Sequence, residues 1–258
     1  MDEHEEHLRL AIDGRVATLT IDRPARRNAM SFAMWSALPG LMRQVSAAPD
    51  VRVLIIAGTG HFSAGADISE FATLRAGADG ARRYGAAVHA GERAIAELEI
   101  PVIAAISGFC IGGGCEIALA CDIRMAAQDA RFGITPAKLG IVYNLTSTKQ
   151  LVDAVGPAWA KRILFSADLL DAPTALRIGL VEELVPGGEL PGRARELADR
   201  IASRAGVSVR GAKQIVARIT DGHYAEDDAV QAIYDEAVLS PEYAEGVAAF
   251  LEKRPPAF

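Results

Sequence analysis

Three consecutive glycines, residues 112–114, stand just before a single carboxylate, Glu116, in an otherwise apolar run. Glycines at the start of a helix have no Cβ that would cover their backbone N–H groups. The N–H groups of the first helical turn also have no hydrogen-bond acceptor within the helix. The helix dipole adds positive partial charge there, so such donors favour an anion. The pattern has two interpretations. In the first, the amides bind an oxyanion and Glu116 carries a proton; in the second, the glycines only allow close helix packing and Glu116 is an acid at a helix start.

The same segment lacks the features of a stable phosphate site. A Walker loop needs Gly-Lys-Ser/Thr after its glycines, and a dinucleotide fingerprint needs Gly-x-Gly-x-x-Gly with an acid further on. Here Cys115 and Glu116 follow, and an acid in the first helical turn would repel a permanent phosphate. A transient oxyanion therefore fits the segment better.

A second turn rich in small residues, residues 58–67, follows another apolar run and leads into a helix start at Asp67. Its Ser63 is not in a Gly-x-Ser-x-Gly nucleophile motif, because the spacing between Gly60 and Gly65 is one residue too long. We therefore interpret the turn as a second source of backbone amides. Two such turns could direct two donors at one thioester carbonyl oxygen.

Composition excludes several classes of protein. The chain of 258 residues has a formal charge of −6, with acids spread along it, so neither nucleic acid nor an anionic membrane is an expected partner. Cys110, Cys115 and Cys121 lack paired metal-site spacing, so we expect buried hydrophobes rather than disulfides or a metal site. The acidic start has no apolar leader and no stretch has membrane-span length, which predicts a soluble cytoplasmic protein.

Short apolar strands are expected to position the two glycine-bearing turns. Asp13 and Gly14 separate two alternating runs and predict a hairpin. Fully apolar runs further on are typical of a sheet buried on both faces. The predicted strands are residues 7–12, 15–21, 51–57, 101–106 and 122–126.

Segments of helical period alternate with these strands. Ser31 can cap a helix, which Pro39 is expected to kink or split. An Ala-rich segment, residues 76–97, is predicted to be helical but broken near Gly80 and Gly85.

After about residue 186 strand-like runs stop and amphipathic helices follow. Helices this short are marginal in isolation, so they must pack on the first part of the chain or on another subunit. The predicted helices of this tail are residues 190–201, 207–219, 225–239 and 241–252.

Together, four segments resemble the enoyl-CoA hydratase/isomerase family, the crotonase superfamily: residues 23–30, 62–68, 108–123 and 250–258. The resemblance implies an α/β fold, a crotonase-like spiral of β-β-α units over residues 1–186 that holds the CoA and catalytic site. Residues 187–258 would form a C-terminal helical trimerisation region. A homotrimer or a dimer of trimers is the implied assembly.

The resemblance also implies roles for individual residues. The backbone N–H groups of Ala66 and Gly113 would form an oxyanion hole that stabilises a thioester enolate. Backbone groups of Ala64, Asp67 and Ile68 would hold the adenine of CoA, which is part of the acyl-CoA substrate; no separate cofactor or metal is expected. Cations that could meet the CoA phosphates, if they are not solvated surface charges, are Arg26, Arg27 and Lys253 of the same or a neighbouring subunit.

Glu116 matches the first of two acids that hydratases of this family use to handle water and the substrate proton. The second acid is missing, because its position is occupied by Pro136, which can neither give nor take a proton. Nearby Lys138 would need strong desolvation to act as a base, and a surface lysine is the simpler interpretation. A single acid can still shuttle a proton between C2 and C4, so isomerisation needs only Glu116, whereas fast simple hydration is not expected.

Tyr143 lies in a segment, residues 135–144, that resembles the methylmalonyl-CoA decarboxylases of the family, where a matching tyrosine lies in the acyl pocket. The alternative is a core aromatic with its hydroxyl paired to backbone. We predict an enzyme of the enoyl-CoA hydratase/isomerase type, with Glu116 as proton-transfer residue. A methylmalonyl-CoA-type decarboxylase and a non-catalytic CoA-binding scaffold are the alternatives.

Overall fold

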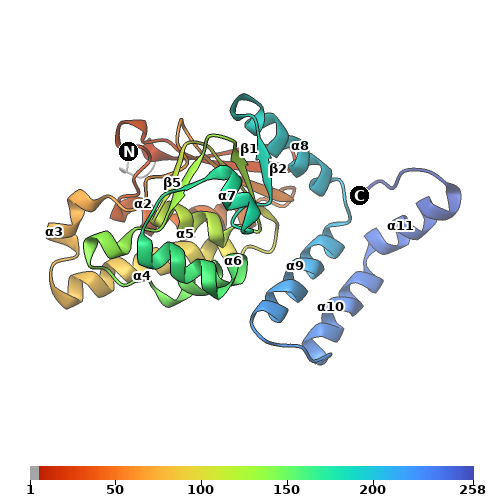
Figure 1. Ribbon diagram of the computed structural model, residues 1–258. Helices are drawn as coiled ribbons and strands as arrows, with labels where there is room; N and C mark the ends of the chain where they lie inside the picture. The colour runs from red at the N-terminus through yellow and green to blue at the C-terminus, as the bar shows by residue number, and fades with distance from the viewer. Residues whose placement is uncertain (1–5) are drawn as a thin grey trace.

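The computed structural model describes residues 6–258 and shows a mixed α/β fold built on two sheets (Figure 1). Residues 1–5, on which the expectation of no leader segment partly rests, lie outside the described residues. The strands are β1 (Leu8–Asp13), β2 (Val16–Ile21), β3 (Val53–Gly58), β4 (Val102–Ile106), β5 (Phe109–Ile111), β6 (Ile123–Ala127), β7 (Arg131–Gly133), β8 (Leu170–Asp171) and β9 (Glu183–Val185).

Helices surround these strands. The α-helices are α2 (Phe32–Ser46), α3 (Phe71–Leu74), α4 (Gly77–Ala96), α5 (Gly113–Ala120), α6 (Leu145–Ser166), α7 (Ala172–Arg177), α8 (Leu190–Ala202), α9 (Gly206–Thr220), α10 (Asp228–Leu239) and α11 (Pro241–Glu252). Short 3₁₀ helices are η1 (Pro24–Arg26), η2 (Ile68–Glu70), η3 (Pro136–Leu139) and η4 (Gly187–Glu189).

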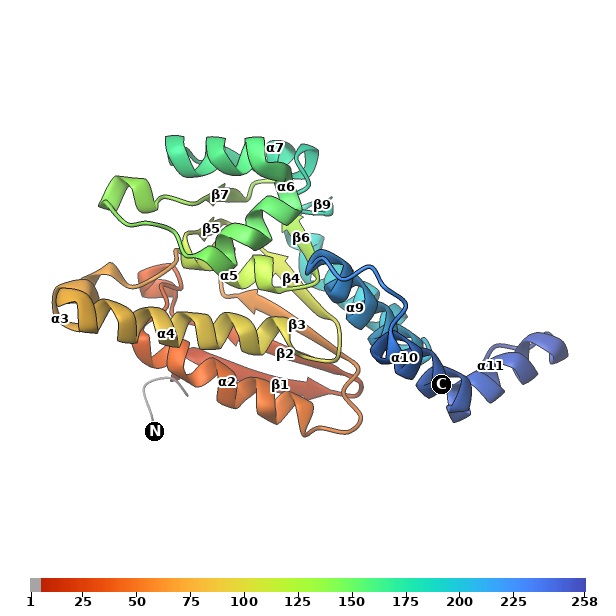
Figure 2. The same ribbon diagram turned by 90° about the horizontal axis from the view of Figure 1, so that it is seen from below.

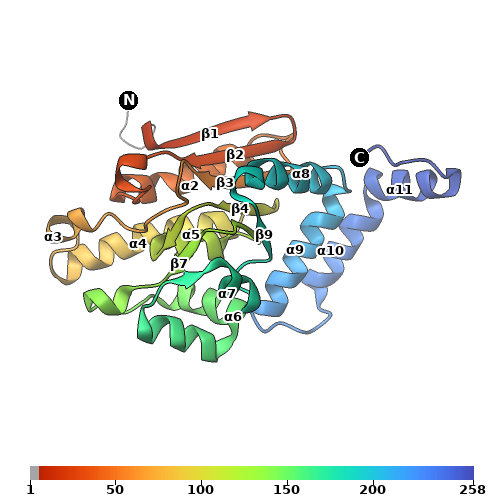
Figure 3. The same ribbon diagram turned by 45° about the horizontal axis from the view of Figure 1, so that its top comes forward.

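The larger sheet has the strand order β1-β2-β3-β4-β6-β9, and the smaller one β5-β7-β8. The predicted hairpin of β1 and β2 is confirmed, and the remaining neighbours in the larger sheet are parallel. Alternate residues face opposite sides, so Leu54 and Ile56 pack towards α2 and α4 while Val53 and Ile55 pack against α8 (Figures 2 and 3). Both faces of the central strands are therefore buried, as their apolar composition predicted. The three short strands of the smaller sheet were not predicted.

The predicted cap of α2 is confirmed, because the Ser31 hydroxyl accepts a hydrogen bond from the Met34 N–H at 3.2 Å. Of the predicted kink or split at Pro39, the split is wrong, since α2 continues through this residue. A proline inside a helix costs about 3 kcal/mol. Burial of the α2 face that carries Trp35 and Leu38 offsets this cost.

The predicted break of α4 is also wrong, because the helix is continuous past Gly80 and Gly85. Each glycine inside a helix costs about 1 kcal/mol relative to alanine. The compensation comes from close packing on α2: a Cβ added to Gly91 would lie 2.9 Å from Leu38 Cδ1. Tertiary packing outweighs local propensity here.

The C-terminal helices are amphipathic, as predicted, but they fall into two groups. Helix α8 packs on the larger sheet, where Ala198 and Ala202 belong to the buried cluster of that face. Helices α9–α11 project away from the sheets (Figure 1), and Val216, Leu239 and Phe250 are exposed on them. The division at residue 186 and the trimer stay predictions. Across residues 6–258, no helix has both the length and the apolar character that crossing a membrane requires.

Candidate active site

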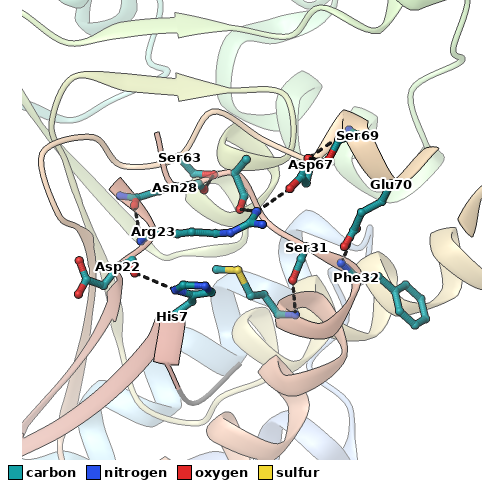
Figure 4. A network of polar contacts seen from close by, with 12 residues as sticks. His7, Asp22, Arg23, Asn28, Ser31, Phe32, Ser63, Asp67, Ser69 and Glu70 are labelled. Atoms are coloured by element: carbon teal, nitrogen blue, oxygen red, sulfur yellow. Dashed lines mark hydrogen bonds and ion pairs between the residues drawn. The ribbon is translucent and has the colours of Figure 1, made fainter. Parts of the chain in front are cut away.

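The turn that contains Ser63 is fixed by polar contacts with the N-terminal segment (Figure 4). The Ser63 hydroxyl donates to the Asn28 carbonyl at 2.7 Å and accepts from the Gly65 N–H at 3.1 Å. Arg23 donates to the Asp67 carboxylate at 2.6 Å, and both side chains are largely buried. Ser63 thus has a structural role, in agreement with the absence of a nucleophile motif.

The turn presents the amide of Ala66 next to that of Gly113. Met30 bonds to the residues on either side of Ala66, donating to the Gly65 carbonyl at 2.7 Å and accepting from the Asp67 N–H at 2.9 Å. Gly113 begins α5, where the first N–H groups have no helical partner. A Cβ added to Gly113 would lie 3.4 Å from the Ala66 nitrogen. Within the described part of the chain, neither amide donates a hydrogen bond to another protein group.

Glu116 lies in the first turn of α5 and faces the same point. A Cβ added to Gly113 would lie 3.4 Å from Glu116 Oε2, and Asn144 Nδ2 donates to Oε1 at 3.3 Å. Burial raises the pKa of Glu116 to about 8, and the nearby charge of Glu92 adds to the effect. Two free amides and one carboxyl group therefore surround a single location.

A pocket opens over this location. Sequence-predicted residues in its lining are Ala64, Ala66, Ile68, Gly113, Glu116 and Tyr143. Pro136 also lines the pocket, so the position expected for a second acid does face the site. Most other lining side chains are apolar, among them Trp35, Phe71 and Val88. The pocket can hold an apolar acyl group against the amides and Glu116.

Two tyrosines of the pocket lining carry buried hydroxyl groups. Among the described residues, the hydroxyls of Tyr84 and Tyr143 have no hydrogen-bond partner. Tyr143 is therefore not a core aromatic paired to backbone. Burial raises the pKa of both tyrosines, so both remain protonated donors at neutral pH.

Of the three residues expected to hold the adenine of CoA, Ala64 and Ile68 line the pocket. The N–H groups of Ala64 and Asp67 donate to the carbonyls of Arg27 and Met30, each at 2.9 Å, and the Asp67 carbonyl accepts from the Glu70 N–H at 3.1 Å. Asp67 itself does not line the pocket. The side chain of Arg27 stacks over Phe109, with the guanidinium carbon 5.4 Å from the ring centre.

Three other cations considered from the sequence do not line the pocket. Arg26 ends η1 at the surface, and Lys138 is exposed at the end of η3. Lys253 follows α11, beyond α9 and α10 from the pocket of its own chain (Figure 1). None of the three lines the pocket.

Sequence reasoning missed a second carboxyl group near Glu116. Glu92 of α4 is fully buried, and the Ser147 hydroxyl donates to its Oε1 at 2.6 Å. Burial raises the pKa of Glu92 to about 7. A signal was available, because Glu92 lies four residues after Val88 and three before Ile95, on the apolar face of the helix.

Comparison with known proteins agrees with this geometry. Residues 11–258 match the family model for enoyl-CoA hydratase/isomerase. The short-chain-enoyl-CoA hydratase of Clostridium acetobutylicum is 38% identical over 248 residues, covering 94% of this chain and 93% of that protein. The crotonyl-CoA hydratase of Syntrophomonas wolfei is 38% identical over 255 residues, or 96% of each chain.

A solved structure extends the similarity to three dimensions. The crystal structure of an enoyl-CoA hydratase/carnithine racemase from Magnetospirillum magneticum superposes with a TM-score of 0.93 at 35% identity, covering 98% of this chain and 95% of that one. Both the sequence match and the shared fold extend over nearly the whole chain. The chain is therefore an enzyme that belongs to the enoyl-CoA hydratase/isomerase family, within the crotonase superfamily.

Proposed function

We propose that this enzyme converts a short-chain enoyl-CoA, by hydration or double-bond isomerisation, through a thioester enolate. One observation carries the proposal: a Cβ on Gly113 would lie 3.4 Å from both Ala66 N and Glu116 Oε2, so two free amides and an acid meet at one point. The names of two relatives, a short-chain-enoyl-CoA hydratase and a crotonyl-CoA hydratase, support the substrate class.

The amides of Ala66 and Gly113 would bind the thioester oxygen. Negative charge accumulates on this oxygen when the C=O group becomes part of an enolate. Both amides belong to fixed backbone, so little reorganisation is needed as the charge develops. One such donor contributes about 3–4 kcal/mol to lowering the barrier.

Glu116 would transfer the proton. Its pKa of about 8 makes both protonation states available near neutral pH. The ionised carboxylate accepts a proton from water or from C4 of the substrate, and the resulting acid returns a proton to C2. The O–H bond formed in the first step is the one broken in the second, so the residue is regenerated.

The CoA part would lie along the turn that contains Ala64 and Ile68, with Arg27 and Arg26 beside it. Lys253 could reach the phosphates only from a neighbouring subunit, since it lies away from the pocket of its own chain. We propose that the exposed apolar residues of α9–α11 pack in a homotrimer, which light scattering can test. A monomer at micromolar concentration would contradict that assembly.

Turnover of a thioester panel tests the function. Crotonyl-CoA, a 3-enoyl-CoA and methylmalonyl-CoA are assayed with the wild type and with Glu116→Gln, which keeps the size of the side chain. We expect turnover of an enoyl substrate, and a loss of about 10²–10⁴-fold in kcat in the variant, because proton transfer is removed. Undiminished turnover by Glu116→Gln on the best substrate would contradict the proton-transfer role.

A specific observation favours decarboxylation as the second candidate. Pro136 faces the pocket where a second acid is expected, and Tyr143 lines the same pocket with a hydroxyl that has no hydrogen-bond partner among the described residues. Loss of CO₂ generates the enolate directly, so this reaction needs the amides more than a proton acceptor. Rapid CO₂ release from methylmalonyl-CoA with inert enoyl substrates would select it. CoA binding without turnover of any panel member would favour a scaffold.

A further inference from the structure

Glu92 brings a second carboxyl group next to Glu116 from a different helix. Glu92 belongs to α4 and Glu116 to α5, and these helices pack together. The Glu92 side chain has no exposed surface and does not line the pocket. It therefore cannot touch a substrate, and any effect on the reaction must pass through other residues.

Two residues at the start of α6 connect the carboxyl groups. The Ser147 hydroxyl donates to Glu92 Oε1 at 2.6 Å. Asn144 Nδ2 donates to the Ser147 oxygen at 2.7 Å and to Glu116 Oε1 at 3.3 Å. Asn144 also caps α6, its Oδ1 accepting from the Ser147 N–H at 2.8 Å, which fixes the amide orientation. The two acids thus share one rigid set of donors.

Glu92 has few polar neighbours besides the Ser147 hydroxyl. Among the described residues, its Oε2 has no hydrogen-bond partner, and the nearby His89 ring places its Nδ1 3.6 Å away, beyond hydrogen-bond distance. Two carboxyl groups that are connected through shared donors in a buried site disfavour simultaneous ionisation. Other titratable groups that face the pair are Tyr84 from α4, Cys115 from α5, Arg75 after α3 and Tyr143 before α6.

We propose that Glu92 is a positioning residue, which shares one proton with Glu116 and acts on it as the second carboxyl group of a buried pair. When Glu92 is ionised, its charge helps to keep the proton on Glu116, ready for transfer. The hydrogen bonds through Ser147 and Asn144 hold both groups in place. The catalytic consequence rests on the proposed function, whereas proton sharing is a property of the free enzyme.

The pair itself is tested without substrate. Infrared titration of the carboxylic C=O band is recorded for the wild type, Glu92→Gln and Glu116→Gln, with the exposed Glu99→Gln as control. We expect the wild-type band to persist above pH 6, where ordinary glutamates have lost it. In Glu92→Gln the remaining band should titrate at lower pH by about one unit or more, because coupled acids shift each other by that amount.

The reciprocal variant keeps the test decisive if Glu92→Gln does not fold. Coupling is mutual, so Glu116→Gln must move the titration of Glu92 to lower pH as well. Unchanged titration of the remaining acid in either folded variant would overturn the proposal. This readout does not depend on finding the substrate, so failure of the proposed function and failure of the pair are distinguishable.

Activity provides the second readout. One limb of the kcat/KM–pH profile reports the ionisation of Glu116. With the best thioester of the panel, Glu92→Gln should move this limb to lower pH and leave KM nearly unchanged. Glu92→Asp, which retains the charge, should restore the limb towards its wild-type position. A lower Tm with an unmoved pH profile in Glu92→Gln would show that Glu92 is only structural and would overturn the catalytic part.

Discussion

Replacing Gly113 by alanine perturbs the point where the amides of Ala66 and Gly113 meet Glu116. The added methyl group would lie 2.9 Å from Trp35 Cζ2, and 3.4 Å from both Ala66 N and Glu116 Oε2. It would therefore occupy the place assigned to the thioester oxygen. Gly113 does not have a positive φ, so the substitution introduces no backbone strain and its effect comes from the methyl group.

The magnitudes follow from those contacts. Trp35 is completely buried and cannot move freely, so overpacking should destabilise the fold by about 1–3 kcal/mol, less about 1 kcal/mol gained in helix propensity. Displacing the oxygen from one amide donor should raise the barrier by about 2.7–4 kcal/mol, which is a loss of about 10²–10³-fold in kcat. The rate effect should thus exceed the stability effect.

Steady-state kinetics on the best thioester, with urea unfolding in parallel, separates the two effects. Gly192→Ala on α8 is the matched control, because its added Cβ would meet nothing within 4 Å. We expect the control to keep its activity and to gain up to about 1 kcal/mol in stability from helix propensity. A folded Gly113→Ala enzyme with wild-type kcat would refute the placement of the oxyanion between the two amides.

Two further predictions concern stability. The pKa of Glu116 in the folded state, about 8, exceeds the ordinary glutamate value of 4.5, so the folded state holds a proton that the unfolded state loses. The contribution of this group to stability should therefore be highest below pH 4.5 and fall as the pH rises to about 8. Urea midpoints across that range should fall less steeply in Glu116→Gln, and an identical slope would argue against a buried, protonated acid. Arg23→Ala should destabilise the enzyme by about 3 kcal/mol, because it leaves Asp67, whose side chain is 7% exposed, without its cation. Chemical denaturation checks this against Arg82→Ala, which removes an exposed pair and should change little; equal effects would contradict the reasoning.

Local signals in the sequence were sufficient for much of the fold and for singling out Glu116 in the candidate site. The Ser31 cap, the Asp13–Gly14 turn and the glycine entry into α5 depend on neighbours within a few residues, and each is present in the structure. The family followed from four segments read together. Glu116 was recognisable because a carboxylate next to a glycine run is unusual in an apolar segment.

Tertiary structure alone decided how the distant parts meet. Ala66 and Gly113 are far apart in sequence, and their amides converge only because Met30 holds one turn while α5 begins at the other. The continuity of α2 and α4 depended on mutual packing, which local propensity does not contain.

Glu92 shows the same limit for the chemistry of the site. Its position on the apolar face of α4 is visible in the sequence, but its pairing with Glu116 requires α4, α5 and the start of α6 to pack together. Spacing along one helix reports which face a residue occupies. The protonation of a buried acid is set by the groups that other elements bring against that face.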